Sequence, residues 1–418
     1  MTDYARCLDE APPAVTRTPR AGHLPSLDGL RAVSIALVLL GHLRGTRGFA
    51  RLDLGVGDYG HLGVVVFFVI SGFLITRLML SEQTKSGRVS LGLFYARRVL
   101  RLFPASYAFI TVVWLLWATG LIHLQATDIW HAVTYTVNYL PGRSWQIGHL
   151  WSLSVEEQFY FIWPCAFVLL VTPRRAGWAA AAVIVFGPVA RSAAWLFLRG
   201  TPDYDLEFFP MVADCLASGC LLAFVSGWLE GKRWYLQLFR PAYSAGLVAL
   251  ILMINRYEGY TVVSVFGTSV VNLSLAILIH RSVYCFRDPI GRVLNWRPVA
   301  FVGVLSYSLY LWQQLFLNRN STAWINAFPQ NLALAIAAAL GSYFLLEKPF
   351  LKLRSRLRGR EAVLYPQAGS FLPAFNLRQV APVNAEHLGH FNLRPVLLPP
   401  QSADTIPEAY TNVRRDRI

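Results

Sequence analysis

Apolar runs of about twenty residues recur along this chain, and they limit what it can fold into. As a helix, each run is long enough to cross about 30 Å of hydrocarbon, and a soluble core needs far fewer of them. The composition agrees, because 55% of the 418 residues are hydrophobic and only 15% are charged. The sequence therefore predicts an all-α fold, a polytopic bundle of transmembrane helices.

The apolar runs mark about ten membrane spans. The spans are predicted at residues 27–44, 60–80, 102–122, 151–172, 176–198, 208–225, 241–255, 260–279, 299–318 and 324–346. The chain then divides into an N-terminal tail (1–26), a transmembrane domain (27–350) and a C-terminal tail (351–418). The C-terminal tail contains prolines and lacks helical or strand periodicity, which predicts that it is largely disordered.

The Lys and Arg residues divide unequally between alternate loops, with 24 on one side of the predicted membrane and 7 on the other. Because cationic loops are retained in the cytosol, the richer side and both chain termini are predicted to be cytosolic. Topology and attraction to anionic membrane lipid then explain the formal net charge of +15, and no nucleic-acid partner is expected. The cations on the outer side are Arg44, Arg47, Arg51, Arg143, Arg199, Arg256 and Arg319.

The first span, LDGLRAVSIALVLLGHL, carries Arg31 near one end and His42 near the other. This spacing places both on one helix face, about 16 Å apart along the axis. A cation and an imidazole on that face are costly unless the face lines a cavity or the protein interior. His42 is therefore a candidate functional residue, although an intramembrane histidine can also be a structural hydrogen-bonding group.

The fourth span runs inward from HLWSLSVEEQFYF, so His149, Glu156 and Glu157 begin at the same outer depth as His42. A neutral imidazole oriented by a carboxylate can take a proton from a hydroxyl, and imidazole titrates near neutral pH. This group of residues could activate an alcohol. In the alternative interpretation, the two carboxylates only cap the N-terminus of the fourth helix.

Three arginines, Arg97, Arg98 and Arg101, precede the third span in FYARRVLRLFP. Their guanidinium groups suit phosphate, which they can bind through two parallel hydrogen bonds while always remaining charged. A donor that carries a nucleotide would require such groups. The alternative is that these arginines, like Arg31, only fix the topology, because cations are expected on the cytosolic side.

Other residues in the spans favour structural roles. Ser71 and Gly72 are small enough to let helices or a ligand approach closely. Trp151 is typical of an interfacial aromatic, with sugar stacking as the alternative. Arg191 in the fifth span and Asp214 in the sixth fall at comparable depths, which predicts an ion pair rather than acceptor binding.

These segments resemble the acyltransferase family 3 membrane proteins, which include O-acetyltransferases of bacterial surface polysaccharides, peptidoglycan and nodulation factors. The resemblance covers about 27–350, and its motifs occur in the family's order. They are Arg31 and His42 with ten residues between them, FFVISGFLI, the Arg-x-x-Arg of Arg98 and Arg101 followed by a Pro, WSLSVEEQFY with Glu156, LSYSLYLW at 305–312 and LEKPF at 346–350.

The resemblance implies a ten-helix core that takes an acyl group, usually acetyl, from cytosolic acyl-CoA to a hydroxyl of a glycan at or beyond the outer face. It implies a bacterial cytoplasmic membrane location. His42 and Glu156 would be catalytic, while the arginines at 31, 97, 98 and 101 would bind the acyl-CoA. No permanently bound cofactor and no metal site are expected, since acyl-CoA is a co-substrate.

Six further residues are candidates for the acceptor or its pocket: Ser71, Trp151, Glu157, Tyr160, Tyr310 and Gln313. One of them departs from the family pattern, because many relatives have His after SYSLYLW where this chain has Gln313. An amide cannot act as a base near neutral pH, so proton transfer at that position is in doubt.

Two alternatives remain beside acylation of a glycan. Within the same enzyme class, the acceptor would be a small hydroxylated molecule such as a macrolide sugar or a lipid. In another class, the protein would be a transporter or translocase of lipid-linked sugars whose polar residues line a permeation path. The sequence shows no internal repeat, which argues against transport.

Overall fold

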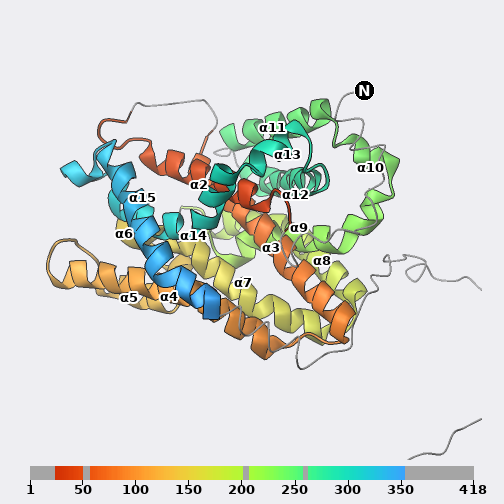
Figure 1. Ribbon diagram of the computed structural model, residues 1–418, viewed down its shortest axis with the longest axis horizontal. Helices are drawn as coiled ribbons and strands as arrows, with labels where there is room; N and C mark the ends of the chain where they lie inside the picture. Colours follow the sequence, from red (N-terminus) through yellow and green to blue (C-terminus); the bar gives the residue numbers. More distant parts are fainter. Residues whose placement is uncertain (1–23, 50–56, 201–206, 258–261, 354–418) are drawn as a thin grey trace, which may run out of the picture. The chain divides into compact units, whose positions relative to one another are not determined.

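A computed structural model describes residues 24–49, 57–200, 207–257 and 262–353 (Figure 1). This part of the chain is built from helices and contains no strand, which confirms the prediction of an all-α fold. Most of the predicted N-terminal tail lies outside the described residues, as does the predicted C-terminal tail from residue 354 onward.

The longer helices alternate with short helical segments. The longer ones are α2 (Leu27–Leu43), α3 (Tyr59–Ser86), α4 (Leu91–Ala118), α7 (Leu150–Leu169), α8 (Pro173–Leu198), α9 (Phe209–Glu230), α11 (Pro241–Arg256), α12 (Thr268–Tyr284), α14 (Arg297–Phe316) and α15 (Gln330–Ser342). The short ones are α5 (Ala126–Val133), η1 (Val137–Tyr139), α6 (Trp145–Gly148), α10 (Arg233–Gln237), α13 (Pro289–Leu294) and η3 (Trp324–Asn326). Two π-helical turns, η2 (Val263–Gly267) and η4 (Tyr343–Glu347), adjoin α12 and α15.

Seven described helices are long and apolar enough to cross a membrane. They are α3, α4, α8, α9, the joined η2 and α12, α14, and the helix Gln330–Leu353 that contains α15 and η4. The other three predicted spans are also helical, but α2 has 17 residues, α11 has 16, and the 20-residue α7 carries two glutamates. A total of about ten spans with cytosolic termini therefore stays a prediction.

Two helices start at a different residue from the predicted span, both for a local reason. The third span was predicted to begin at residue 102, and α4 already begins at Leu91, because long Arg side chains can keep their charges at an interface while the helix continues. The tenth span was expected from residue 324, but Trp324–Asn326 forms a separate 3-10 turn. The helix starts only at Gln330, directly after Pro329, which cannot donate a backbone hydrogen bond.

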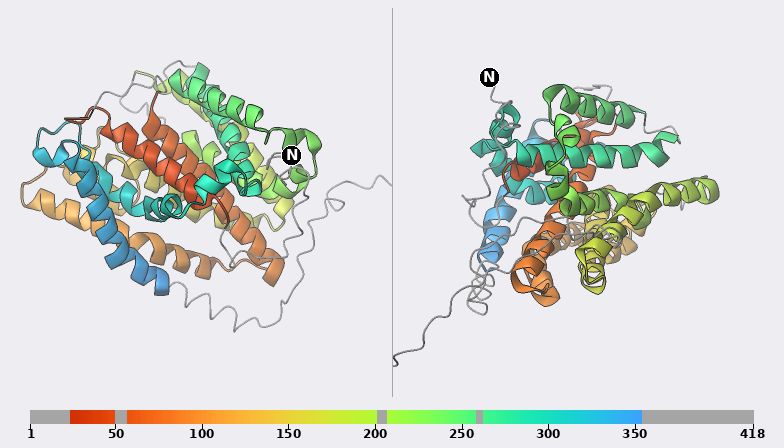
Figure 2. Two further views of the ribbon diagram at one scale, coloured as in Figure 1. Left: turned by 45° about the horizontal axis from the view of Figure 1, so that its top comes forward. Right: turned by 90° about the vertical axis from the view of Figure 1, so that its right-hand side faces the viewer.

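Helix α3 is the centre of the bundle and lies against α2 and α9 (Figures 1 and 2). In its most apolar stretch 72% of the residues are buried, against 28% in α8 and 22% in the helix Gln330–Leu353. Two glycines bring α3 and α9 close together. A Cβ on Gly72 would lie 1.9 Å from the Leu216 carbonyl oxygen, and one on Gly219 would lie 2.0 Å from that of Val69. Gly72 is thus a packing residue.

The predicted ion pair between Arg191 of α8 and Asp214 of α9 is confirmed. The Arg191 guanidinium donates to both Asp214 carboxylate oxygens, at 3.1 and 2.9 Å, and both side chains are buried. Arg191 also donates to the carbonyl of Val265 and to the hydroxyl of Ser269, which in turn donates to Asp214. The pair therefore ties α8, α9 and the helix Val263–Tyr284 together.

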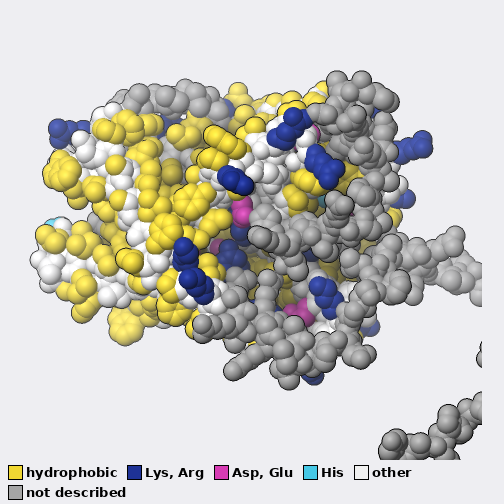
Figure 3. All heavy atoms as spheres, in the orientation of Figure 1, with side chains coloured by type: hydrophobic (Ala, Val, Ile, Leu, Met, Phe, Trp, Pro, Cys, Tyr) yellow, Lys and Arg dark blue, Asp and Glu magenta, His cyan; other side chains and the backbone are white. Residues whose placement is uncertain are grey.

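Large apolar side chains are exposed on many of the helices. Phe197 is 80% exposed, Leu169 79% and Leu345 77%. Figure 3 shows apolar side chains over much of one face, most densely on its left side, with Lys and Arg farther right. A soluble monomer rarely exposes so much apolar surface, so this surface agrees with contact to lipid.

Candidate functional site

His42 lies at the C-terminal end of α2, half-buried, against the edge of the Trp145 ring. The two ring centroids are 5.8 Å apart and nearly perpendicular. The Gln313 side chain lies beside the imidazole, but neither of its amide atoms forms a hydrogen bond of normal geometry within the described residues. The Nδ1 atom of His42 is also buried there without a hydrogen-bond partner. The imidazole is therefore held by packing rather than by a carboxylate.

A second imidazole, His149, lies near His42 at the start of α7. It is buried, and its Nε2 is 3.0 Å from the carbonyl oxygen of Leu311. A carbonyl only accepts, so Nε2 carries the proton and Nδ1 is the bare nitrogen. That Nδ1 has no hydrogen-bond partner in the described structure. The sequence analysis places His149 at the depth of His42, Glu156 and Glu157, but it does not select His149 as a catalytic residue.

Glu156 belongs to a separate cluster, deeper in the bundle. Its carboxylate accepts hydrogen bonds from Ser71 of α3 and from Tyr160, one turn further along α7. Glu156 is seven residues beyond His149, which corresponds to about 10 Å along a helix. Its hydrogen-bond partners in the described part of the chain do not include His42, so the structure does not bring the two predicted catalytic residues together.

The position of Glu156 also excludes the capping interpretation. Helix α7 begins at Leu150, and a helix N-terminus stabilises carboxylates only within its first turn. Glu156 and Glu157 come later. Glu157 lies close to Glu156 and Arg98.

Tyr310 of α14 lies between the two clusters. Its hydroxyl is 2.8 Å from the carbonyl oxygen of His149, to which it donates, and 2.5 Å from the Ser152 hydroxyl. Its ring contacts His149 and, edge-on, Phe67 of α3. Because Tyr310 and Glu156 are close enough to interact electrostatically, polar side chains extend from His42 through Tyr310 to Glu156.

The arginines predicted to bind acyl-CoA are held by different elements. Arg98 lies over the Tyr160 ring with its guanidinium carbon 3.4 Å from the ring centroid, a cation–π contact. Arg97 pairs with Glu82 at the end of α3, at 3.3 Å, and Arg31 pairs with Asp28 at the same distance. Arg98 is thus the arginine that joins the Glu156 cluster directly.

The last two motifs of the chain also meet. Ser308 of α14 donates a hydrogen bond to Glu347 in the final helix, and Arg101 is close enough to Glu347 to interact with it electrostatically. Motifs far apart in the sequence therefore converge at one end of the polar column, which the sequence order alone does not show.

Trp151 is buried and packs with its ring plane nearly parallel to that of His61, at 6.1 Å between ring centroids. Phe68 contacts it edge-on, also at 6.1 Å. This residue lies inside the bundle instead of at an exposed interface. Trp151, which was predicted as a possible pocket residue, therefore belongs to the core beside the start of α3.

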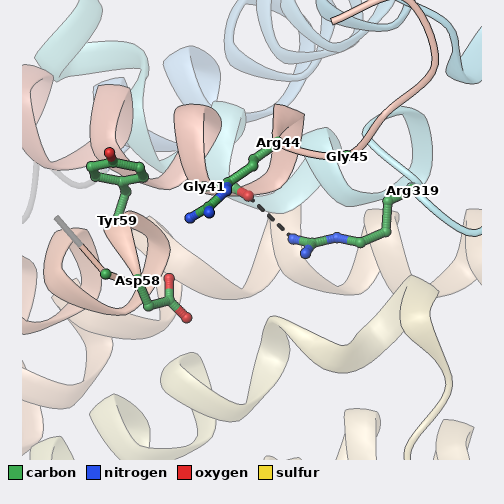
Figure 4. Close-up of a pocket in the computed structure, with 7 residues that line it drawn as sticks. Gly41, Arg44, Gly45, Asp58, Tyr59 and Arg319 are labelled. Carbon is green, nitrogen blue, oxygen red and sulfur yellow. Dashed lines mark hydrogen bonds between the residues drawn. The ribbon is translucent and has the colours of Figure 1, made fainter. Parts of the chain in front are cut away.

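A pocket of about 630 Å³ opens beside His42. Residues from the end of α2, the start of α3 and the segment after α14 line it, among them Arg44, Asp58, Tyr59 and Arg319 (Figure 4). Arg319 donates to the carbonyl oxygen of Gly41, at 3.1 Å. The volume of the pocket is in the range of small-ligand sites. The sequence analysis did not predict any residue of this pocket as a site residue. Two of them, Arg44 and Arg319, are among the few cations on the predicted outer side.

The fold and these clusters are those of a polytopic helical membrane protein with a polar interior, and residues 24–347 match the acyltransferase domain model. The chain belongs to this acyltransferase family.

Curated relatives point the same way. The chain is 26% identical over 376 residues to the peptidoglycan O-acetyltransferase OatA of Listeria monocytogenes, covering 82% of this chain and 57% of that protein. It is 30% identical over 329 residues to the putative peptidoglycan O-acetyltransferase YrhL of Bacillus subtilis, covering 71% and 49%. A putative O-acetyltransferase of Staphylococcus aureus is 26% identical, covering 81% and 59%.

The chain thus spans about half the length of the curated relatives that it matches. No solved structure matches it.

Proposed function

We propose that this protein is a membrane O-acyltransferase, specifically an O-acetyltransferase, that moves an acyl group from cytosolic acyl-CoA to a hydroxyl of a cell-surface or exported glycan. The observation that supports it most is the column of polar side chains from Arg98, through Tyr160, Glu156, Tyr310 and His149, to His42. It lies inside a chain of the acyltransferase family, and the relatives named above are O-acetyltransferases of bacteria. We therefore also propose a location in the bacterial cytoplasmic membrane.

In the proposed reaction His42 is the general base. Its imidazole takes the proton of the acceptor hydroxyl while the hydroxyl oxygen attacks the thioester carbonyl. A C–O ester bond forms, the C–S bond breaks, and the CoA thiolate leaves and takes up a proton. The Nδ1 of His42 is buried and has no hydrogen-bond partner in the described structure, which supports this role because no described group occupies the lone pair that a base needs.

The proposed donor site lies at the other end of the column. Arg98 is the best-placed arginine, because its guanidinium faces Tyr160 in the interior and its Nε is buried without a hydrogen-bond partner among the described residues. A phosphate of CoA would supply that partner. Arg97, Arg101 and Arg31 would assist from positions where each already interacts with a carboxylate.

The test is transfer of radiolabelled acetyl from acetyl-CoA to extracted bacterial cell-surface glycan by the purified protein. Replacing His42 by Ala should lower kcat by about 100- to 10,000-fold, the usual contribution of general acid–base catalysis. The protein fold is monitored by thermal unfolding in detergent. Undiminished transfer by the folded His42→Ala protein would contradict the proposed role. Movement of lipid-linked sugars without release of CoA thiol would instead identify a translocase.

A further inference from the structure

The pocket beside His42 is unusually cationic for its predicted location. Two of the seven Lys and Arg residues on the predicted outer side, Arg44 and Arg319, line this one pocket. Lys and Arg are less frequent on the outer side of membrane proteins than on the cytosolic side, so two of them in one outer pocket suggest a binding role. Figure 4 shows both guanidinium groups directed toward the same space, with Asp58 and Tyr59 on its other side.

Arg319 connects the pocket to the Trp145 ring beside His42. Its guanidinium carbon lies 5.2 Å from the centroid of the Trp145 ring, and that ring packs against His42. Gly45 adopts a left-handed backbone conformation with φ of +88° and lies beside Arg319, whose Cβ atom would be 3.8 Å from a Cβ added to this glycine. A molecule bound to Arg319 would therefore lie next to the Trp145 ring that packs against the imidazole.

The remaining pocket residues suit a sugar. Tyr59 borders the pocket, and the exposed Asp58 offers a carboxylate that can accept from a sugar hydroxyl. Asp58 is itself fixed, because it accepts a hydrogen bond from the backbone of His61 at the start of α3. Among the described residues that line the pocket, two carry a guanidinium group and one carries a carboxylate.

We infer that this pocket binds the acceptor of the proposed transfer, and that the acceptor is an acidic glycan whose sugar carboxylate is held by Arg44 and Arg319. This inference rests on the proposed function and specifies its substrate class. A planar carboxylate matches the fork of a guanidinium, and its sugar then lies beside His42 with a hydroxyl toward the base.

A simpler role for Arg319 has to be separated from this one. Gly41 is among the last residues of α2, so a cation bonded to its carbonyl oxygen also caps the helix. A cap alone would affect stability and would treat acidic and neutral acceptors alike.

The experiment compares two probes, a hexuronate oligosaccharide and the same oligosaccharide with its carboxylates reduced to alcohols. Equilibrium binding and acyl transfer are both measured, on the purified full chain in detergent. Wild type should prefer the acidic probe at least about tenfold in binding and in KM. Arg319→Gln and the double variant Arg44→Gln/Arg319→Gln should lose this preference in binding and in KM, while Arg319→Lys retains part of it.

The control is Arg256→Gln, which removes an exposed cation from the same predicted side but outside the pocket. It should keep the full preference. Equal binding of the two probes by wild type, or an unchanged preference in the double variant, would overturn the inference while leaving acyl transfer intact. Selective binding of the acidic probe without any transfer would support the pocket and contradict the proposed function.

Discussion

At the scale of single residues, the structure gives the two expected catalytic residues different surroundings. His42 lies among Trp145, Gln313 and the outer pocket, whereas Glu156 holds Ser71 and Tyr160. Tyr160 in turn carries Arg98 on its ring. In the proposed reaction, Glu156 would thus be a positioning residue for the donor end, acting through Tyr160 on the arginine.

This assignment makes a prediction for two substitutions at Glu156. Glu156→Ala removes the acceptor of two hydrogen bonds and should raise the KM for acetyl-CoA by about 10- to 100-fold, because bonds to charged groups contribute about 1.5–3 kcal/mol. Glu156→Gln retains an oxygen that can accept from Ser71 and Tyr160, so it should largely restore the KM. Steady-state kinetics with varied acetyl-CoA checks both.

A different kinetic result for the two Glu156 variants would contradict the positioning role. If Glu156 assists His42 chemically, Gln is as damaging as Ala, and the loss appears in kcat with the KM for acetyl-CoA unchanged.

At the scale of helices, the sequence predicted more of the fold than of the site. Apolar runs correctly located every long helix, since burial in lipid or protein requires continuous hydrophobicity. The ion pair of Arg191 and Asp214 was also predicted, because an unpaired charge at that depth is costly. The pocket beside His42 was not predicted, since Arg44, Asp58 and Arg319 come from three segments whose contact depends on how the helices pack.

One prediction at this scale concerns the contact of α3 and α9. Gly219→Ala should destabilise the protein by about 1–3 kcal/mol, because the new Cβ would lie 2.0 Å from the Val69 carbonyl oxygen, a backbone atom that cannot move alone. The matched control is Gly227→Ala in the same helix, where nothing lies within 4 Å of the added carbon. Thermal unfolding in detergent should show a lower Tm for the first variant only. Equal Tm values would contradict the close packing.

A second prediction concerns the buried pair that joins α8 and α9. Asp214→Asn should cost about 3–5 kcal/mol, because it leaves the Arg191 charge buried without its counter-ion. The double variant Arg191→Met/Asp214→Leu should lose much less, since no uncompensated charge remains. Denaturation midpoints of the three proteins test this. A double variant as unstable as the single one would show that the pair contributes more than mutual charge compensation.

At the scale of the whole molecule, the proposed transfer requires a polar column whose two ends differ chemically. Arg98, Arg101 and Glu347 meet at one end of the polar column, and His42 with the outer pocket lies at the other. The unequal Lys and Arg counts predict which end faces the cytosol. A nucleotide-bearing donor and an exported acceptor would then remain on opposite sides of the membrane, and only the acyl group would pass between them.

The most direct measurement uses sealed proteoliposomes that contain the acceptor glycan, with radiolabelled acetyl-CoA added only outside. Protein molecules whose arginine-rich side faces outward should form labelled acetyl ester on the enclosed glycan, while free CoA accumulates outside. His42→Ala should form almost none. Ester formation only when donor and acceptor share one compartment, or equal formation by His42→Ala, would contradict transfer across the membrane through His42.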